Sequence, residues 1–150
     1  MCFLDAGLPV TLVDVDDTAA VAAAAGIDAT YRRSSAFKKG RLTEAALAAK
    51  LAKLAVASDV AALGGADLVV EAIYEDLNAK RDVFARLDGA CKPTAVLASN
   101  TSTLSIDAIA GAVADPARVV GTCVEINQCV GCTKSFLGDD AAVLARSSSM

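Results

Sequence analysis

The sequence of 150 residues has no histidine and no tryptophan, and only six of its residues are aromatic. Without histidine, these residues cannot form a Ser-His-Asp triad, a His-ligated metal site or an imidazole acid–base pair. The apolar runs also fall short of the roughly 18 residues that a membrane-spanning helix requires. The sequence therefore predicts no membrane span and excludes the histidine-dependent forms of catalysis within this chain.

Small apolar side chains are abundant instead. Hydrophobic residues make up 55% of the chain, charged residues make up 21%, and 33 residues are alanine. This composition predicts a folded domain rather than a disordered chain. A core of small side chains suits the close packing of helices on a sheet.

The net charge of −4 is unevenly distributed. Between Thr30 and Ser58 there are seven cations and one carboxylate, a balance of +6, whereas the rest of the chain carries −10. The cations are Arg32, Arg33, Lys38, Lys39, Arg41, Lys50 and Lys53. Such a segment can attract an anionic ligand, or it can be the solvated face of a helix. No nucleic-acid partner is predicted, because the whole chain is acidic and lacks an aromatic ladder beside the cations.

Five cysteines are present, an odd number that favours a reducing compartment. Cys2 and Cys91 are isolated and are predicted to be small buried apolar residues. Cys123, Cys129 and Cys132 form a C-x5-C-x2-C cluster that can supply three zinc ligands. A fourth ligand and a second C-x-x-C pair are missing, so we predict accidental clustering and no metal site.

Short apolar runs alternate with amphipathic segments along the chain. Strands are predicted at residues 9–14, 66–73, 95–98 and 118–121, and helices at 1–6, 18–37, 43–54, 77–88 and 105–110. This alternation predicts a parallel sheet with helices on both faces, which binds ligands beyond the carboxyl ends of its strands. No helical or strand period follows Gly121, and residues 146–150 are expected to be unstructured.

Three polar groups follow the predicted strands. Asp14 ends the first strand, where a carboxylate can bind the ribose of a dinucleotide or can be an ordinary turn acid. Glu71 and Glu75 follow the second strand with Lys80, and such residues can bind ribose hydroxyls or can be a helix-start acid and a surface lysine. Residues 99–103 place five consecutive hydrogen-bonding side chains after the third strand. They can bind a ligand or can be ordinary turn residues, although turn chemistry does not by itself call for five in a row.

Five blocks of the sequence occur together in a specific order. They are Gly7-Leu-Pro-Val-Thr-Leu-Val-Asp14, Gly40-Arg-Leu-Thr43, Ala66-Asp-Leu-Val-Val-Glu-Ala-Ile-Tyr-Glu-Asp-Leu-Asn-Ala-Lys80, Leu97-Ala-Ser-Asn-Thr-Ser-Thr-Leu104 and Pro116-x-Arg-Val-Val-Gly121. Over residues 1–121 they resemble the NAD-binding domain of 3-hydroxyacyl-CoA dehydrogenases, and most nearly the form found in multifunctional fatty-acid β-oxidation enzymes. The resemblance implies a Rossmann-like α/β fold, NAD as the cofactor and oxidation of 3-hydroxyacyl-CoA to 3-ketoacyl-CoA.

The resemblance also implies roles for particular residues in binding the cofactor. Asp14 would hold the adenosine ribose of NAD. The nicotinamide half would be lined by Ile73, Tyr74, Glu75 and Lys80.

Ser102 is the residue that the resemblance places at the reaction centre, in contact with both the nicotinamide and the substrate oxygen. The basic stretch from Thr30 to Lys39 matches the part of the family that contacts coenzyme A. Thr30 and Lys38 are its implied contacts. An acyl-CoA substrate is therefore expected, and intact relatives are expected to be dimeric or part of a multifunctional enzyme. The peroxisome, the mitochondrion and the bacterial cytoplasm all stay open as compartments.

The chain departs from the family pattern at both ends, which predicts truncation. The family begins with a strand and a glycine-rich loop that would precede Met1, so its central strand is expected to be missing and the backbone groups of its neighbours exposed. The family's general-base histidine corresponds to Cys123, and its partner glutamate falls near Ser135. We therefore predict a partial NAD-binding domain at residues 1–121, a divergent, poorly ordered tail at 122–150, and impaired catalysis. The alternatives are a non-catalytic CoA- or nucleotide-binding or interaction module and an unstable truncated product.

Overall fold

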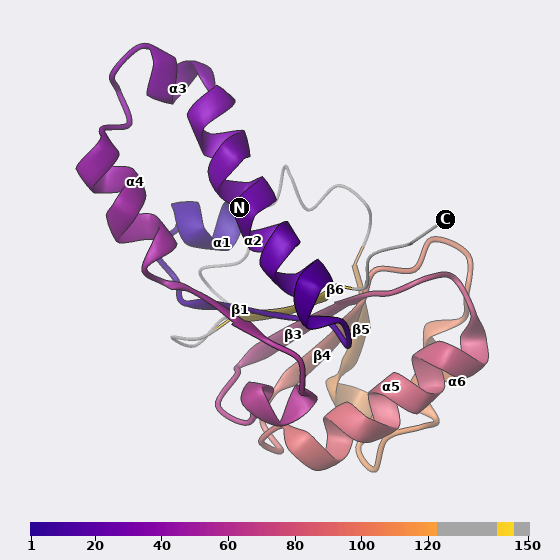
Figure 1. Ribbon diagram of the computed structural model, residues 1–150. Helices are drawn as coiled ribbons and strands as arrows, with labels where there is room; N and C mark the ends of the chain where they lie inside the picture. The colour runs from indigo at the N-terminus through magenta and orange to yellow at the C-terminus, as the bar shows by residue number, and fades with distance from the viewer. Residues whose placement is uncertain (123–140, 146–150) are drawn as a thin grey trace.

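The computed structural model describes residues 1–122 and the backbone of residues 141–145. Over this part of the chain, six parallel strands form one sheet in the order β2-β1-β6-β3-β4-β5. The strands are β1 (Val10–Val13), β2 (Leu54–Ala57), β3 (Leu68–Ala72), β4 (Val96–Ser99), β5 (Val119–Gly121) and β6 (Ala141–Ala145). The predicted parallel α/β architecture is confirmed (Figure 1).

Helices cover both faces of the sheet. They are α1 (Cys2–Asp5), α2 (Asp17–Arg33), α3 (Ser35–Lys38), α4 (Glu44–Leu51), α5 (Leu77–Ala90) and α6 (Ile106–Ala110), with 3-10 turns η1 (Val60–Leu63) and η2 (Pro116–Arg118). In Figure 1, α5 and α6 lie on one side of the sheet, and α1, α2 and α4 lie on the other. No helix within residues 1–122 combines the length and the apolar character that crossing a bilayer would take.

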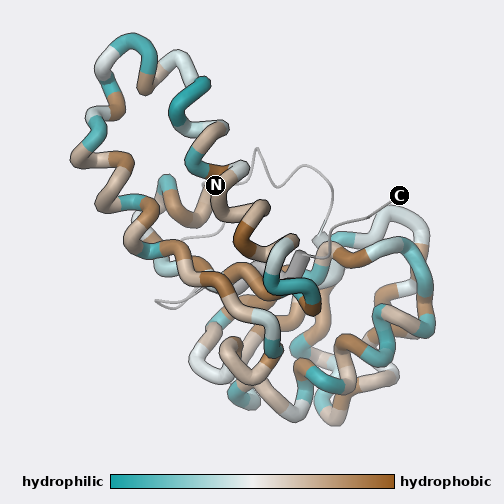
Figure 2. Tube along the Cα trace, viewed as in Figure 1, coloured by the Kyte–Doolittle hydropathy of each residue, from teal (hydrophilic) through white to brown (hydrophobic). Residues whose placement is uncertain are grey.

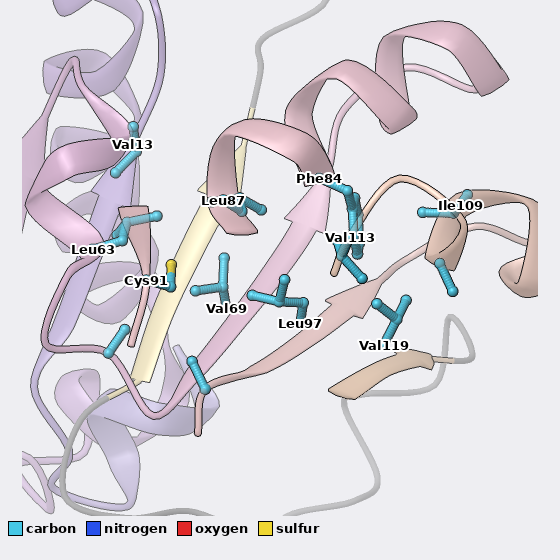
Figure 3. Packing of buried hydrophobic residues seen from close by; sticks show 13 residues of the cluster. Val13, Leu63, Val69, Phe84, Leu87, Cys91, Leu97, Ile109, Val113 and Val119 are labelled. Carbon is cyan, nitrogen blue, oxygen red and sulfur yellow. The ribbon is translucent and has the colours of Figure 1, made fainter. Parts of the chain in front are cut away.

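Two apolar cores result, one on each face. Val69 belongs to the core beneath α5 and α6, whereas its neighbours Leu68 and Val70 belong to the other core, because successive side chains of a strand point to opposite faces. Phe84 and Leu87 of α5 are completely buried in the first core (Figure 3). Burying a side chain of this size contributes about 1.5–3 kcal/mol to the stability of the fold. The apolar face of α5 is therefore what mainly holds this helix on the sheet.

The helices α2, α3 and α4 form an arm that extends away from the sheet (Figure 1). Hydrophilic residues gather at its outer end, around α3 (Figure 2). Arg32 joins the two long sides of the arm, with its guanidinium 2.8 Å from the Asp28 carboxylate and 2.7 Å from that of Glu44. These exposed ion pairs neutralise Arg32, one of the seven cations of the basic segment. They contribute little to the stability of the fold.

The predicted helix boundaries are confirmed where a polar side chain caps the helix. Asp16, Thr43 and Ser105 each accept a hydrogen bond, at 2.8–3.3 Å, from a backbone N–H in the first turn of the helix that follows. Gly7 ends α1 with a φ of 82°, a conformation that glycine adopts without a steric penalty.

The structure corrects the predicted helix at residues 18–37. Ser34 has extended backbone angles, which end α2 at Arg33, and its hydroxyl accepts from the Phe37 N–H at 3.2 Å to start α3. One serine therefore caps two helices and turns the chain between them.

The strand β2 was not predicted. Its sequence, Leu-Ala-Val-Ala, continues the alanine-rich pattern of α4, so the sequence predicts helix as far as residue 54. Pairing with β1 overrides that preference: the carbonyls of Lys53 and Ala57 accept from backbone N–H groups of β1 and of the residue after it. A further correction concerns Cys2, which is only half-buried, whereas Cys91 is buried as predicted.

The strand β6 lies between β1 and β3, which do not pair with each other. Val143 is in register with Leu12 of β1 on one side and with Val70 of β3 on the other. The sequence predicts no element after Gly121 and a gap at the centre of the sheet, and the structure corrects both expectations. Unpaired backbone groups inside a sheet are costly, and the two ladders of β6 satisfy those of β1 and β3. The cluster of Cys123, Cys129 and Cys132 lies outside the described residues.

Replacing Val143 with proline is expected to abolish cooperative thermal unfolding, because proline removes a ladder N–H from a strand that is paired on both sides. A melt followed by circular dichroism measures this loss. A melt as cooperative as that of the unmodified chain would contradict the central position of β6.

The matched control is Val56→Pro in the edge strand β2, since Val56 is in register with the same residue, Leu12. The carbonyls of Lys53 and Ala57 face β1, so the N–H of Val56 points away from that strand. An edge strand tolerates proline at such a position, and this variant should retain a cooperative melt.

Candidate functional site

A cavity of about 210 Å³ lies at the carboxyl ends of β1 and β3. Asp14, directly after β1, and Ile73 and Tyr74, directly after β3, all line it. The full lining is Val13, Asp14, Val15, Ser58, Val60, Ile73, Tyr74, Ala79, Asp82, Val83 and Arg86. Three predicted site residues that are far apart in the sequence therefore share one cavity.

Asp14 brings a carboxylate to an otherwise mostly apolar wall. The residue is only 6% exposed, and its carboxylate accepts a hydrogen bond from the Asp16 N–H at 3.1 Å. Val15 and Tyr74 are 62% and 50% exposed, so apolar and aromatic surface lies open beside this acid. A carboxylate acceptor next to apolar walls matches a ligand that carries both a flat ring and hydroxyl groups.

The Glu75 carboxylate organises the loop after β4. One of its oxygens accepts from the hydroxyls of Thr101 and Thr103 and from the backbone N–H groups of Ser102 and Thr103, the last two at 3.2 and 3.3 Å. The Thr101 hydroxyl bond, together with the Thr103 bonds and the charge of Lys80, lowers the pKa of Glu75 to about 2 despite some desolvation. Glu75 is therefore ionised at neutral pH and holds the 101–103 loop against the loop that follows β3.

A second acid, Glu71, is completely buried at the end of β3. Its carboxylate accepts from the Lys80 ammonium at 2.7 Å, from the Ser99 hydroxyl at 2.6 Å and from the Ile73 N–H at 2.6 Å. Both charged side chains are 0% exposed. The Glu75 carboxylate lies farther from the Lys80 ammonium, at 3.5 Å.

The structure thus brings most of the predicted site residues together. Glu75 and Ser102 are joined by a hydrogen bond, and Glu75 directly follows the two loop residues that line the cavity. Lys80 also belongs to this region, but its side chain is buried beneath the loop and not exposed at its surface.

Thr30 and Lys38 lie elsewhere, on the arm. The Thr30 hydroxyl donates to the Gly26 carbonyl of its own helix at 2.7 Å. Lys38, Lys39 and Arg41 are exposed. They make no ion pair with a residue of the described segments.

Sequence reasoning missed the true partner of Lys80 and one wall of the cavity. The sequence grouped Lys80 with both Glu71 and Glu75 without choosing between them, and the structure shows that Glu71 is the closer partner. The single acid within the apolar run Leu-Val-Val-Glu-Ala was the available signal. Asp82 and Arg86 line the cavity with Ala79, and their spacing of three and four residues marks one face of α5.

Comparison with known proteins identifies the family to which the fold belongs. Residues 1–123 match the family described as 3-hydroxyacyl-CoA dehydrogenase, NAD binding domain. The chain belongs to this family. The 3-hydroxyadipyl-CoA dehydrogenase of Escherichia coli (strain K12) is 40% identical over 115 residues, which are 77% of this chain and 24% of that protein. The peroxisomal bifunctional enzyme of Homo sapiens is 49% identical over 65 residues, 43% of this chain and 9% of that protein.

Solved structures agree with this assignment. The crystal structure of 3-hydroxybutyryl-CoA dehydrogenase from Escherichia coli K12 matches 97% of this chain with a TM-score of 0.76 and 30% identity, and the match covers 34% of that chain. The present chain therefore spans only about a quarter to a third of the length of these two Escherichia coli relatives. The fold is that of the Rossmann-type 3-hydroxyacyl-CoA dehydrogenases of fatty-acid β-oxidation.

NAD is the cofactor of this family's domain, and the residues of the cavity fit it. The Asp14 carboxylate can accept from ribose hydroxyls and would repel a 2′-phosphate, which favours NAD over NADP. In the loop after β4, the side-chain oxygen of Asn100 is buried without a partner among the described residues, so an acceptor is left for a ligand. No group of three or more potential metal ligands occurs within the described part of the chain.

Glu75→Gln is expected to lower the melting temperature at pH 7, because a neutral amide holds the 101–103 loop less strongly than a carboxylate does. The pKa of Glu75 in the folded chain lies near 2, below its ordinary value of 4.5. Its stabilising effect is therefore complete above about pH 4.5 and is lost as the pH falls toward 2. Thermal melts of both chains across this range should converge at acid pH.

Asp107→Asn is the control, since the Asp107 carboxylate accepts no hydrogen bond from a described residue. At pH 7 its melting temperature should fall by less than that of the Glu75→Gln variant, because an acid in the first turn of a helix contributes only about 0.3–1 kcal/mol. A constant difference between the Glu75→Gln variant and the unmodified chain down to pH 2 would contradict the assigned role.

Proposed function

We propose that this chain binds NAD at the carboxyl edge of the sheet and serves the oxidation of 3-hydroxyacyl-CoA to 3-ketoacyl-CoA. The observation that carries this proposal is the convergence of Asp14, Ile73 and Tyr74 on one cavity, beside the loop that Glu75 holds. Ligands of open parallel sheets bind at this edge. Membership of the family supports the same reaction.

Each residue of the site has a distinct role in this proposal. NAD supplies the hydride acceptor for the hydrogen at C3 of the substrate. Asp14 accepts from the adenosine ribose, and Ile73 and Tyr74 cover the cofactor beyond it. Glu75 fixes the loop that presents Ser102, whose hydroxyl makes no hydrogen bond with a described residue and so can donate to the substrate oxygen.

The arm supplies the contact with the acyl-CoA substrate in the same proposal. Lys38 and its neighbour Lys39 carry outward-facing charges at the hydrophilic end of the arm, where they attract the phosphates of coenzyme A (Figure 2). Thr30 lies in the last turn of α2, the helix that precedes α3, and adds a hydroxyl group to this proposed contact.

Catalysis by these 150 residues alone should be weak. Oxidation of the 3-hydroxyl requires a base to remove its proton, and the sequence contains no histidine. General-base catalysis is worth on the order of 10²–10⁴-fold in rate. A non-catalytic CoA- or nucleotide-binding role is the second candidate, favoured by the same absence and by the outward-facing cations of the arm.

The isolated chain is expected to reduce acetoacetyl-CoA with NADH at least about 100-fold more slowly than the 3-hydroxybutyryl-CoA dehydrogenase of Escherichia coli. In this direction the base of the oxidation must act as the acid that protonates the carbonyl oxygen, and the sequence has no histidine for that role. The absorbance of NADH follows the reaction. Near-normal turnover would refute the impairment.

Calorimetric titration separates the two candidates: binding of acyl-CoA without NAD would favour the non-catalytic role.

Asp14→Asn should raise the Kd for NADH about tenfold or more, because hydrogen bonds to a charged group contribute about 1.5–3 kcal/mol. It should also narrow the preference for NADH over NADPH, since the repulsion of a 2′-phosphate is lost. Fluorescence titration with both nucleotides measures these effects.

The control is Asp17→Asn, an exposed acid three residues along the chain that does not line the cavity. Its Kd for NADH should stay within about twofold of that of the unmodified chain. Equal affinities of the Asp14 and Asp17 variants for NADH would show that Asp14 does not bind the nucleotide.

A further inference from the structure

One buried carboxylate connects both loops of the proposed nicotinamide site. We propose that Glu71 is a positioning residue: with Lys80, it fixes the loops after β3 and β4 so that the nicotinamide half of NAD is held in one orientation. This inference rests on the proposed function, because it concerns how the same site holds its cofactor.

The contacts of Glu71 reach the first residues of both loops. Its side-chain oxygens accept from the Ile73 N–H at 2.6 Å, in the loop after β3, and from the Ser99 hydroxyl at 2.6 Å, at the end of β4. Its backbone carbonyl accepts from the Asn100 N–H at 2.8 Å. A single residue thus sets where the two loops leave the sheet.

Lys80 extends this network toward Ser102. Its ammonium lies 2.7 Å from the Glu71 carboxylate and 3.4 Å from the Ile73 carbonyl, and it is 3.5 Å from the second oxygen of Glu75. Glu75 in turn accepts from the Ser102 N–H. A continuous series of polar contacts therefore runs from Ser99 through the buried pair to the residue proposed to touch the substrate.

Stability alone does not account for a charged pair at this place. Removing two charges from water carries a desolvation cost that their attraction often fails to offset, and apolar replacements of similar volume are frequently as stable. What apolar side chains cannot supply is the set of directed bonds to Ile73 and Ser99. The pair therefore acts through the geometry of the loops.

The test replaces both charges at once, by Glu71→Gln with Lys80→Met, since removing one charge would leave the other buried and unpaired. NADH is titrated by fluorescence, and ADP-ribose, which lacks the nicotinamide, is titrated by calorimetry. The double variant should bind NADH about tenfold more weakly and ADP-ribose within about twofold of the unmodified chain. An equal loss of affinity for both ligands, or no loss of affinity for either, would overturn the proposal.

The control for a merely structural effect is Val69→Ala. Val69 lies two residues before Glu71 in β3, is 0% exposed and contacts neither loop by a hydrogen bond. Its variant should melt at a lower temperature but bind both ligands unchanged below that temperature. If the double variant fails to fold, the Ser99→Ala variant is used instead, because it removes only one hydrogen bond of the network. Its affinity for NADH should be about threefold lower than that of the unmodified chain, and its affinity for ADP-ribose should be unchanged.

Hydrogen exchange of the ligand-free chain tests the positioning role without NAD. In the double variant, peptides covering residues 71–76 and 99–104 should exchange faster, while the peptide covering β1 keeps its protection. Unchanged exchange in both loops would overturn the proposal. If the unmodified chain binds neither NADH nor ADP-ribose, the proposed function fails, whereas the exchange result still decides whether Glu71 orders the loops.

Discussion

The strand β6 sets the spacing on which the site depends. Because β1 and β3 both pair with β6 and not with each other, their carboxyl ends lie two strand spacings apart, roughly 10 Å. Asp14 leaves one of these strands, and Ile73 and Tyr74 leave the other, so the cavity opens where β6 separates them. The parallel direction of all three strands is equally necessary, since it brings both polar ends to the same edge.

At that edge of the sheet, two charged residues are buried and a third is partly exposed, and the two groups have different roles. Glu71 and Lys80 are withdrawn from water and connect the loops from below. Glu75 keeps 36% of its side chain exposed and orders the 101–103 loop from above, where its low pKa keeps it charged. The hydroxyl of Ser102 is left without a partner in the described residues and is available to a ligand.

The family relationship and the missing histidine lead to a consistent picture. The fold is that of the NAD-binding domain of the 3-hydroxyacyl-CoA dehydrogenase family, and the matched relatives extend well beyond the length of this chain. In the proposed function, nucleotide binding uses the carboxyl edge of the sheet, whereas removal of the proton needs a base and the sequence contains no histidine.

Local patterns and propensities were enough to predict the parallel α/β class, the starts of the helices near residues 18 and 105, and the acid at the end of β1. The strands at residues 54–57 and 141–145 and the pairing of Lys80 with Glu71 could not be predicted in this way. Those features depend on hydrogen bonds and burial between segments far apart in the chain. A short alanine-rich segment has no local preference strong enough to specify a strand, and a lysine takes as its partner the acid that folding buries beside it.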